Sequence, residues 1–141
     1  MSNTQREIRI GDVYMVEFTG VGCEQHGVRP AVIFQNNTGN KFSPNVIALP
    51  MTSVMKKKSQ PTHVFISAAE SGLLRDSIVL CENPERVSKC RLGAYVTTLT
   101  AEQMKAIAVA SLLAMGAISF LDDRVLFDVR QRAQVLNRLK S

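Results

Sequence analysis

Six short segments of strand-type composition run through the first hundred residues and constrain the fold more than any other feature. Each mixes β-branched and aromatic residues and is bounded by Gly, Pro, Asn or Ser, the pattern of short strands joined by turns. The segments span residues 12–18, 30–35, 45–49, 62–66, 76–81 and 94–98. Short strands at this spacing are typical of a small twisted barrel. A chain of 141 residues is long enough for one such core, so we do not expect a two-domain enzyme.

Two helices are predicted after the strands, so the expected fold class is mainly β with C-terminal helices. Thr100 and Gln103 have the spacing of a capping box, and apolar residues then recur at helical spacing until Gly116 supplies a stop. This helix is apolar on nearly all sides, so we expect the barrel to cover one side and a partner subunit or the tail to cover the other.

The second predicted helix spans about residues 122–138 and is amphipathic, with arginines between its apolar positions. Two interpretations of its surface stay open. In the first, its apolar stripe packs on the preceding helix. In the second, its basic surface contacts nucleic acid or a partner protein.

Composition narrows the classes of function and the compartment. A net charge of +5, from 17 Lys and Arg against 12 Asp and Glu, favours polyanions such as nucleic acid. The 3 cysteines have neither disulfide-framework nor zinc-site spacing, which predicts a reducing compartment. The first ten residues lack the apolar core of a signal peptide, and no segment has the roughly 20 apolar residues of a membrane span. We therefore expect a cytoplasmic protein that does not enter a membrane.

Several kinds of catalytic site are disfavoured because their motifs are missing. His26 and His63 belong to no H-E-x-x-H motif and to no Cys/His pair, so no metal is predicted. The glycines at 20 and 22 lack the dinucleotide-binding register, and no P-loop or nucleophile elbow is present. We expect neither a metal nor an organic cofactor.

Polar and anion-binding residues gather instead in and after the long loop predicted at 19–29. Residues 24–30 read Glu-Gln-His-Gly-Val-Arg-Pro, and they are followed by Gln35-Asn36 and by Met51-Thr52-Ser53. If neighbouring strands pair, we expect the ends of these segments to meet at one rim of the barrel. Such a rim could hold a phosphate group.

These residues resemble the MazF/PemK toxins of bacterial toxin–antitoxin pairs. The resemblance begins at Gly11-Asp12-Val13-Tyr14, includes 24–30 with Gln35-Asn36, and continues in the family's order through 39–44, Thr52, 61–64 and 75–77. It covers roughly residues 9–116, so we divide the chain into a barrel with its helix, 1–116, and a helical extension, 117–141. The resemblance implies an SH3-like β-barrel, the MazF/CcdB-like toxin fold, which forms a homodimer.

The activity that the resemblance implies is metal-independent, sequence-specific cleavage of single-stranded mRNA, which leaves a 2′,3′-cyclic phosphate and a 5′-hydroxyl. Arg29 and Thr52 match the family's catalytic arginine and threonine. A guanidinium suits the charge that develops on the phosphate oxygens, and a hydroxyl can donate to the same group. Glu24 is the third catalytic candidate, either as the base for the 2′-hydroxyl or as a group that orients Arg29.

Five further residues are candidates for RNA binding. Gln25, Gln35, Asn36 and Asn40 could read base edges of a splayed strand, although such residues also serve turns. Lys57, in a run of three lysines, could follow the phosphate backbone or simply be solvated.

The implied partners are single-stranded RNA and a cognate antitoxin, which would compete for one basic groove, with DNA contacted only indirectly through the antitoxin. An alternative is a non-catalytic toxin of the same fold that poisons DNA gyrase by protein contact. A silent relative that regulates its operon with the antitoxin is a third. Arg29 together with Thr52 favours the nuclease. The extension, 117–141, is expected to strengthen the dimer or the antitoxin interface.

Overall fold

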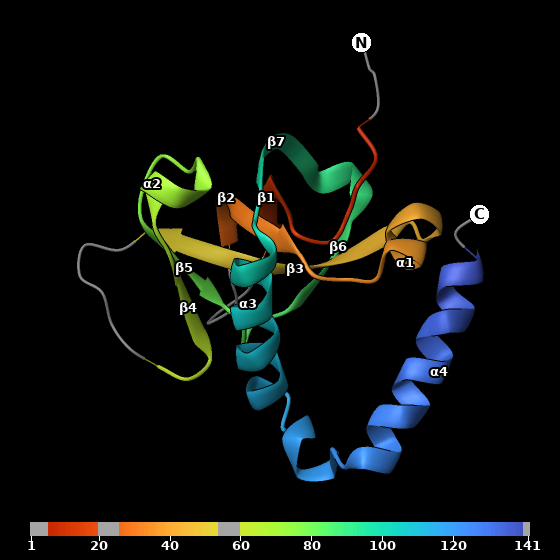
Figure 1. Ribbon diagram of the computed structural model, residues 1–141. Coiled ribbons are helices and arrows are strands. Elements are labelled where there is room, and N and C mark those ends of the chain that lie inside the picture. Colours follow the sequence, from red (N-terminus) through yellow and green to blue (C-terminus); the bar gives the residue numbers. More distant parts are fainter. Residues whose placement is uncertain (1–5, 20–25, 54–59, 140–141) are drawn as a thin grey trace.

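The computed structural model describes residues 6–19, 26–53 and 60–139. These residues form a strongly bent antiparallel sheet followed by helices (Figure 1), which confirms the predicted fold class. The strands are β1 (Asp12–Thr19), β2 (His26–Ile33), β3 (Asn45–Ser53), β4 (His63–Ile66), β5 (Ser77–Leu80), β6 (Glu85–Ser88) and β7 (Leu92–Thr98). The helices are α1 (Asn37–Phe42), α2 (Ala68–Ser71), α3 (Ala101–Ala114) and α4 (Asp123–Leu139), with the short turns η1 (Lys89–Arg91) and η2 (Ala117–Phe120). None of the described helices is both long enough and apolar enough to cross a membrane.

Strand β3 is the centre of the sheet. One of its edges pairs with β2, and the other pairs with β6 along its first half and with β5 along its second half. The strand order is β4-β5-β3-β2-β1-β7, with β6 beside β3. The two end strands, β4 and β7, are not neighbours in this order, so the sheet is barrel-like without closing.

Both faces of the sheet are buried, because successive residues of one strand enter two different cores. On β2, Val32 belongs to one core, while Ala31 and Ile33 belong to the other. Helix α3 covers the first core with the buried side chains of Ile107 and Ala110. The strands therefore carry apolar residues at consecutive positions instead of alternating with polar ones.

Helix α3 begins and ends as the sequence predicts. The Gln103 N–H donates to the Thr100 hydroxyl at 3.1 Å, and the Thr100 N–H donates to the Gln103 side-chain oxygen at 2.8 Å, which completes the capping box. Gly116 follows the helix in the left-handed region, at φ +72°. Only one side of α3 meets the barrel. Its outward side carries exposed apolar side chains, namely Val109, Leu112, Leu113 and Met115.

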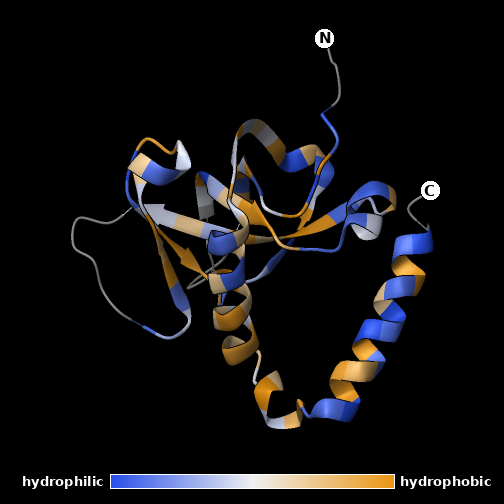
Figure 2. Ribbon diagram, viewed as in Figure 1, coloured by the Kyte–Doolittle hydropathy of each residue, from blue (hydrophilic) through white to orange (hydrophobic). Residues whose placement is uncertain are grey.

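Helix α4 is present where it was predicted, but the interpretation that it packs on α3 is wrong for this chain. Gly116 and η2 redirect the backbone, and α4 diverges from α3 (Figure 1). Its described side chains are all exposed, and apolar positions recur along it (Figure 2). Its far end contacts α1, where the Thr38 hydroxyl donates to the Leu136 carbonyl at 3.1 Å.

Four local features differ from the sequence-based expectation. Helix α1 lies inside the segment predicted as a loop, and neither α2 nor β6 was predicted. Strand β2 also begins earlier than expected, so Arg29 lies in a strand and not in a loop. The reason is its pairing with β1, in which Val28 faces Glu17 and Arg29 faces Val16.

A buried carboxylate joins the N-terminal segment to β1 and β7, and its removal tests this part of the fold. Asp12 is 1 % exposed and accepts from the Arg9 N–H at 3.0 Å, the Thr98 hydroxyl at 2.8 Å and Arg6 at 3.3 Å. We expect Asp12→Ala to lower the free energy of unfolding by about 1–3 kcal/mol, because it removes one buried charged acceptor that three hydrogen bonds share.

Urea unfolding at fixed protein concentration measures this loss. Glu17→Ala, which removes an exposed carboxylate from the same strand, is the control and is expected to change the stability by less than about 0.5 kcal/mol. Equal stabilities of the two variants would contradict the role assigned to Asp12.

Candidate active site

The site begins where the β2–β3 ladder ends. The last paired residues are Ala31 and Pro50, and Pro30 is next to them on β2. The Phe34 N–H donates to the Ile47 carbonyl, so every second residue of β2, down to position 30, faces β3. Pro30 has no N–H to donate at this position, and the hydrogen-bond ladder stops there. Beyond it β3 pairs with β5 on its other edge only, and the space between β2 and β3 opens into a pocket.

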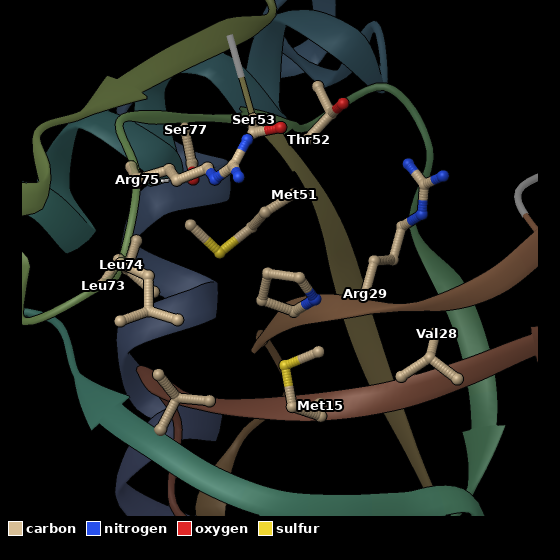
Figure 3. A pocket seen from close by; sticks show the side chains of 12 residues that line it. Met15, Val28, Arg29, Met51, Thr52, Ser53, Leu73, Leu74, Arg75 and Ser77 are labelled. Carbon is tan, nitrogen blue, oxygen red and sulfur yellow. Dashed lines mark hydrogen bonds between the residues drawn. The ribbon is translucent and has the colours of Figure 1, made fainter.

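The register of the two strands brings Arg29 and Thr52 together. Ala31 pairs with Pro50 and Val32 with Leu49, and continuing this register by two residues sets Arg29 opposite Thr52. Figure 3 shows both side chains on one flank of the pocket, with the guanidinium below the threonine. Arg29 and Thr52 therefore line the same pocket, and the catalytic roles predicted for them remain predictions.

The pocket encloses about 540 Å³, within the range of roughly 300–1,000 Å³ for sites that hold small ligands. Its floor is apolar, and its polar groups stand on the flanks (Figure 3). The lining residues are Met15, Val28, Arg29, Pro30, Met51, Thr52, Ser53, Leu73, Leu74, Arg75, Ser77 and Val96. This described lining holds two arginines and no carboxylate, so its field attracts an anion.

Arg29 has a hydrogen-bond donor that is free to bind a ligand. Its side chain is half-buried, and its Nε is a buried donor that has no acceptor among the described residues. Buried donors are nearly always paired, so an unpaired one in a basic pocket indicates a place for a ligand oxygen. Thr52, half-buried beside it, adds a neutral donor.

The opposite flank carries polar groups that sequence reasoning had given no role. Figure 3 shows Arg75, Ser53 and Ser77 there, across Met51 from Arg29. Arg75 and Ser77 stand in one of the motifs of the family resemblance, which is the only sequence signal that pointed to them. The pairing of β5 with β3, in which Ser77 faces Ser53, brings them to the pocket.

The predicted single rim is wrong for Gln35 and Asn36. In an antiparallel pair the start of β2 meets the end of β3, whereas residues after β2 meet the start of β3. These residues therefore lie beside α1, at the far end of β3 from Arg29 and Thr52 (Figure 1).

The side chains near α1 have local hydrogen-bond partners. Asn36 accepts from the Gly39 N–H at 2.8 Å as the cap of α1, and Gln35 donates to the side chain of Asn40 at 3.2 Å. Asn40 is 2 % exposed and donates to the Gln35 carbonyl at 2.8 Å. These three residues serve the turn, and the RNA contacts predicted for them remain predictions.

The remaining predicted site residues, Glu24, Gln25 and Lys57, lie outside the described residues. His63, treated as structural, contacts Glu82 through Nε2 at 2.8 Å and does not line the pocket. In the described part of the chain, no three His, Cys, Asp or Glu side chains gather as a metal-binding group.

Neither described cysteine lines the pocket. Cys81 is buried in the first core, and burial raises the pKa of its thiol to about 11. Cys90 is exposed on η1, beside the Ser88 hydroxyl. The polar groups that the described pocket offers are guanidinium and hydroxyl groups, which are donors suited to phosphate oxygens.

A small barrel-like sheet with a pocket whose described lining has two arginines and no carboxylate is the kind of protein that suits an anionic ligand. Comparison with known proteins identifies the family within that class. The model of the PemK-like, MazF-like toxins of type II toxin–antitoxin systems matches residues 9–113. The chain belongs to this family, as the resemblance in its sequence indicated.

Individual relatives agree with this assignment. The chain is 39 % identical over 114 residues to Endoribonuclease EndoA of Bacillus subtilis (strain 168), a match that covers 80 % of this chain and 98 % of the relative. It is similar to a mycobacterial endoribonuclease solved in complex with its cognate antitoxin, with a TM-score of 0.65, 27 % identity and coverage of 77 % and 95 % of the two chains. MazF of Deinococcus radiodurans shares the fold, with a TM-score of 0.69 at 22 % identity over 79 % of this chain and 99 % of that one.

The raised pKa of Cys81 gives a test of the packing of the first core. At pH 8 a thiol with a pKa of about 11 is ionised in about one molecule in a thousand, and burial further hinders its alkylation. We expect iodoacetamide to label Cys90 readily and Cys81 at least about a hundredfold more slowly in the native protein, as followed by mass spectrometry of the Cys23→Ser variant.

Labelling of the same variant in denaturant provides the control, because both thiols should then react at similar rates. Equal labelling of Cys81 and Cys90 in the native protein would contradict the burial of Cys81.

Proposed function

We propose that the protein is the toxin of a toxin–antitoxin pair and is an endoribonuclease that cleaves single-stranded mRNA at specific sequences without a metal. One observation carries the proposal. The β2–β3 register sets Arg29 opposite Thr52 at a pocket whose described lining has no acid, and the buried Nε of Arg29 has no partner among the described residues. The family assignment and the endoribonuclease relatives support the same activity.

The proposed reaction uses the RNA's own 2′-hydroxyl as the nucleophile. Its oxygen attacks the adjacent phosphorus in line, the bond to the 5′-oxygen breaks, and the products are a 2′,3′-cyclic phosphate and a 5′-hydroxyl. Negative charge builds on the non-bridging oxygens as the new bond forms. Arg29 stabilises that charge with a planar fork of donors, and Thr52 donates its hydroxyl to the same group.

Two protons must move in this reaction. The 2′-hydroxyl loses one, and the departing 5′-oxygen gains one. Glu24 is proposed either as the base that accepts the first proton or as the group that orients Arg29. A variant at this position separates the two roles, because loss of a base changes the pH dependence of kcat, whereas loss of an orienting group lowers kcat without moving the profile.

The proposed regulator is a cognate antitoxin whose flexible segment covers the basic pocket. Such a segment would compete with RNA for Arg29, so inhibition falls as the RNA concentration rises. The relative solved with its antitoxin supports this partner for the family. DNA would be reached only through the antitoxin.

Removal of either donor tests the proposed mechanism. We expect Arg29→Ala and Thr52→Ala each to lower kcat by on the order of 10²–10³, the loss seen when a preorganised donor to a developing oxyanion is deleted. Arg29→Lys, which keeps the charge but not the fork, should recover part of the rate. The measurement is cleavage of an RNA whose cut site has been mapped by 5′-end sequencing.

The controls concern the metal, the nucleophile and the alternative function. EDTA should leave cleavage unchanged, and replacing the 2′-hydroxyl at the cut site with hydrogen should abolish it. Intact RNA together with trapped DNA gyrase complexes would instead support the gyrase-poisoning alternative. Full activity of both alanine variants would contradict the assignment of Arg29 and Thr52.

We propose in addition that the protein is a homodimer whose interface includes α3 and the extension, residues 117–141. The outward face of α3 is apolar and exposed, and α4 presents a second exposed apolar stripe that includes Val125, Val129 and Leu136. Exposed apolar side chains that gather on one face of a helix mark an interaction site. A twofold dimer in which each α4 stripe meets the partner's α3 would cover both surfaces at once.

A charge placed on the stripe of α4 tests this interface. We expect Val129→Glu to weaken the dimer at least about tenfold, because a carboxylate would be buried against apolar side chains. Gln131→Glu adds the same charge on the polar side of α4 and is the matched control. Sedimentation equilibrium of both variants measures the dimer constant, and equal constants would remove α4 from the interface.

A further inference from the structure

We propose that Arg75 forms a second phosphate subsite of the pocket, which holds the phosphate next to the scissile one in bound RNA. The inference rests on the proposed function and deepens it. Arg29 and Thr52 account for one phosphate group, and Arg75 extends the recognition by one nucleotide along the strand.

The position of Arg75 is the first argument. Figure 3 shows Arg75 and Arg29 on opposite flanks, with the apolar side chain of Met51 on the floor between them. A polynucleotide carries one phosphate for every nucleotide, so a strand that places one phosphate at Arg29 brings its neighbour across this floor. Apolar contact suits the base or sugar between two phosphates, because each has a face that needs no hydrogen-bond partner.

The second argument is that the backbone of Arg75 is fixed although its side chain is exposed. The buried Ser77 hydroxyl donates to the Arg75 carbonyl at 3.0 Å, and the adjacent Asp76 accepts from the Ala68 N–H at 2.8 Å. Leu73, two residues earlier, is buried in the first core. The turn therefore presents Arg75 from a fixed point, which lowers the entropy lost when the side chain engages a ligand.

The third argument is the charge. No ion pair joins Arg75 to any carboxylate of residues 6–19, 26–53 or 60–139, and the neighbouring Asp76 is used by the α2 turn. Leu74, beside it at the pocket, is 99 % exposed and offers an apolar surface to a base. Two separated guanidiniums fit a ligand with two separated negative charges, and a single phosphate would engage only one of them.

The experiment combines protein variants with single neutral linkages in the RNA. Arg75→Gln removes one charge from the pocket. Arg86→Gln makes the same change at an exposed position of β6, beside the other end of β3, and is the matched control. The RNA is a short oligonucleotide with one mapped cut site, and two companion oligonucleotides carry a methylphosphonate at the linkage on either side of it.

We expect Arg75→Gln to raise KM about tenfold while kcat stays within about twofold, because contacts away from the reacting phosphate contribute to binding and not to the chemical step. The slope of log binding constant against log salt should fall in magnitude by about 0.7, the value for one phosphate contact on a single strand. Arg86→Gln should change neither quantity, and Arg75→Lys should restore the salt slope and part of the affinity.

The neutral linkages show which group Arg75 contacts. In the wild-type protein one of the two methylphosphonates should raise KM as much as Arg75→Gln does. In Arg75→Gln the same substitution should have no further effect, since the charge and its partner have then both been removed. Additive losses, or equal KM values for Arg75→Gln and Arg86→Gln, would overturn the proposal. A fall in kcat at constant KM would also overturn it, because Arg75 would then act on the scissile phosphate itself.

Binding to single-stranded RNA with a 2′-deoxy residue at the cut site separates this proposal from the proposed function. If the wild type cuts no RNA while Arg75→Gln still binds this probe with a lower salt slope, the nuclease assignment fails and the phosphate subsite stands. If RNA is cut but Arg75→Gln binds like the wild type, the subsite fails alone. Circular dichroism of each variant checks that the fold is unchanged.

Discussion

The pocket exists because one backbone ladder stops. The next hydrogen bond of the β2–β3 ladder would need an N–H at position 30, and Pro30 has none to donate, so the pairing goes no further. A continuous ladder would close this space with backbone and leave Arg29 and Thr52 as an ordinary cross-strand pair on a sheet. With the ladder ended, the same register still sets the two side chains opposite each other, and they now flank an opening large enough for a ligand.

Sequence reasoning predicted the features that depend on local pattern. The capping box at Thr100 and Gln103, the stop at Gly116 and the amphipathic helix α4 are each encoded within a few residues of where they form, and the structure contains all of them. The four-residue strand β6 and the single turn α2 could not be predicted in this way. Elements this short depend on neighbours far along the chain, as β6 does on its pairing with β3.

The residues of the site likewise differ in how far the sequence predicts them. Arg29 and Thr52 were predicted because the family resemblance singled them out, and the strand register explains why these two positions lie opposite each other. Gln35 was misplaced because the sequence does not show which ends of paired strands meet. Arg75 received no role because it reaches the pocket only through the pairing of β5 with β3, some twenty residues away in sequence. Helix α4 lies beyond the matched family region, and the resemblance gave no expectation for its packing.

The two cores on either side of the sheet restrict how the pocket between β2 and β3 can change. A shift of one residue between β2 and β3 would exchange the side chains of both cores and turn Thr52 away from Arg29. The register of the strands is thus fixed by the packing of the two cores and not by contacts in the pocket. The lining of the pocket can therefore change chiefly through the connections around the opening, such as the turn that carries Leu74 and Arg75, while the strands keep Arg29 and Thr52 in place.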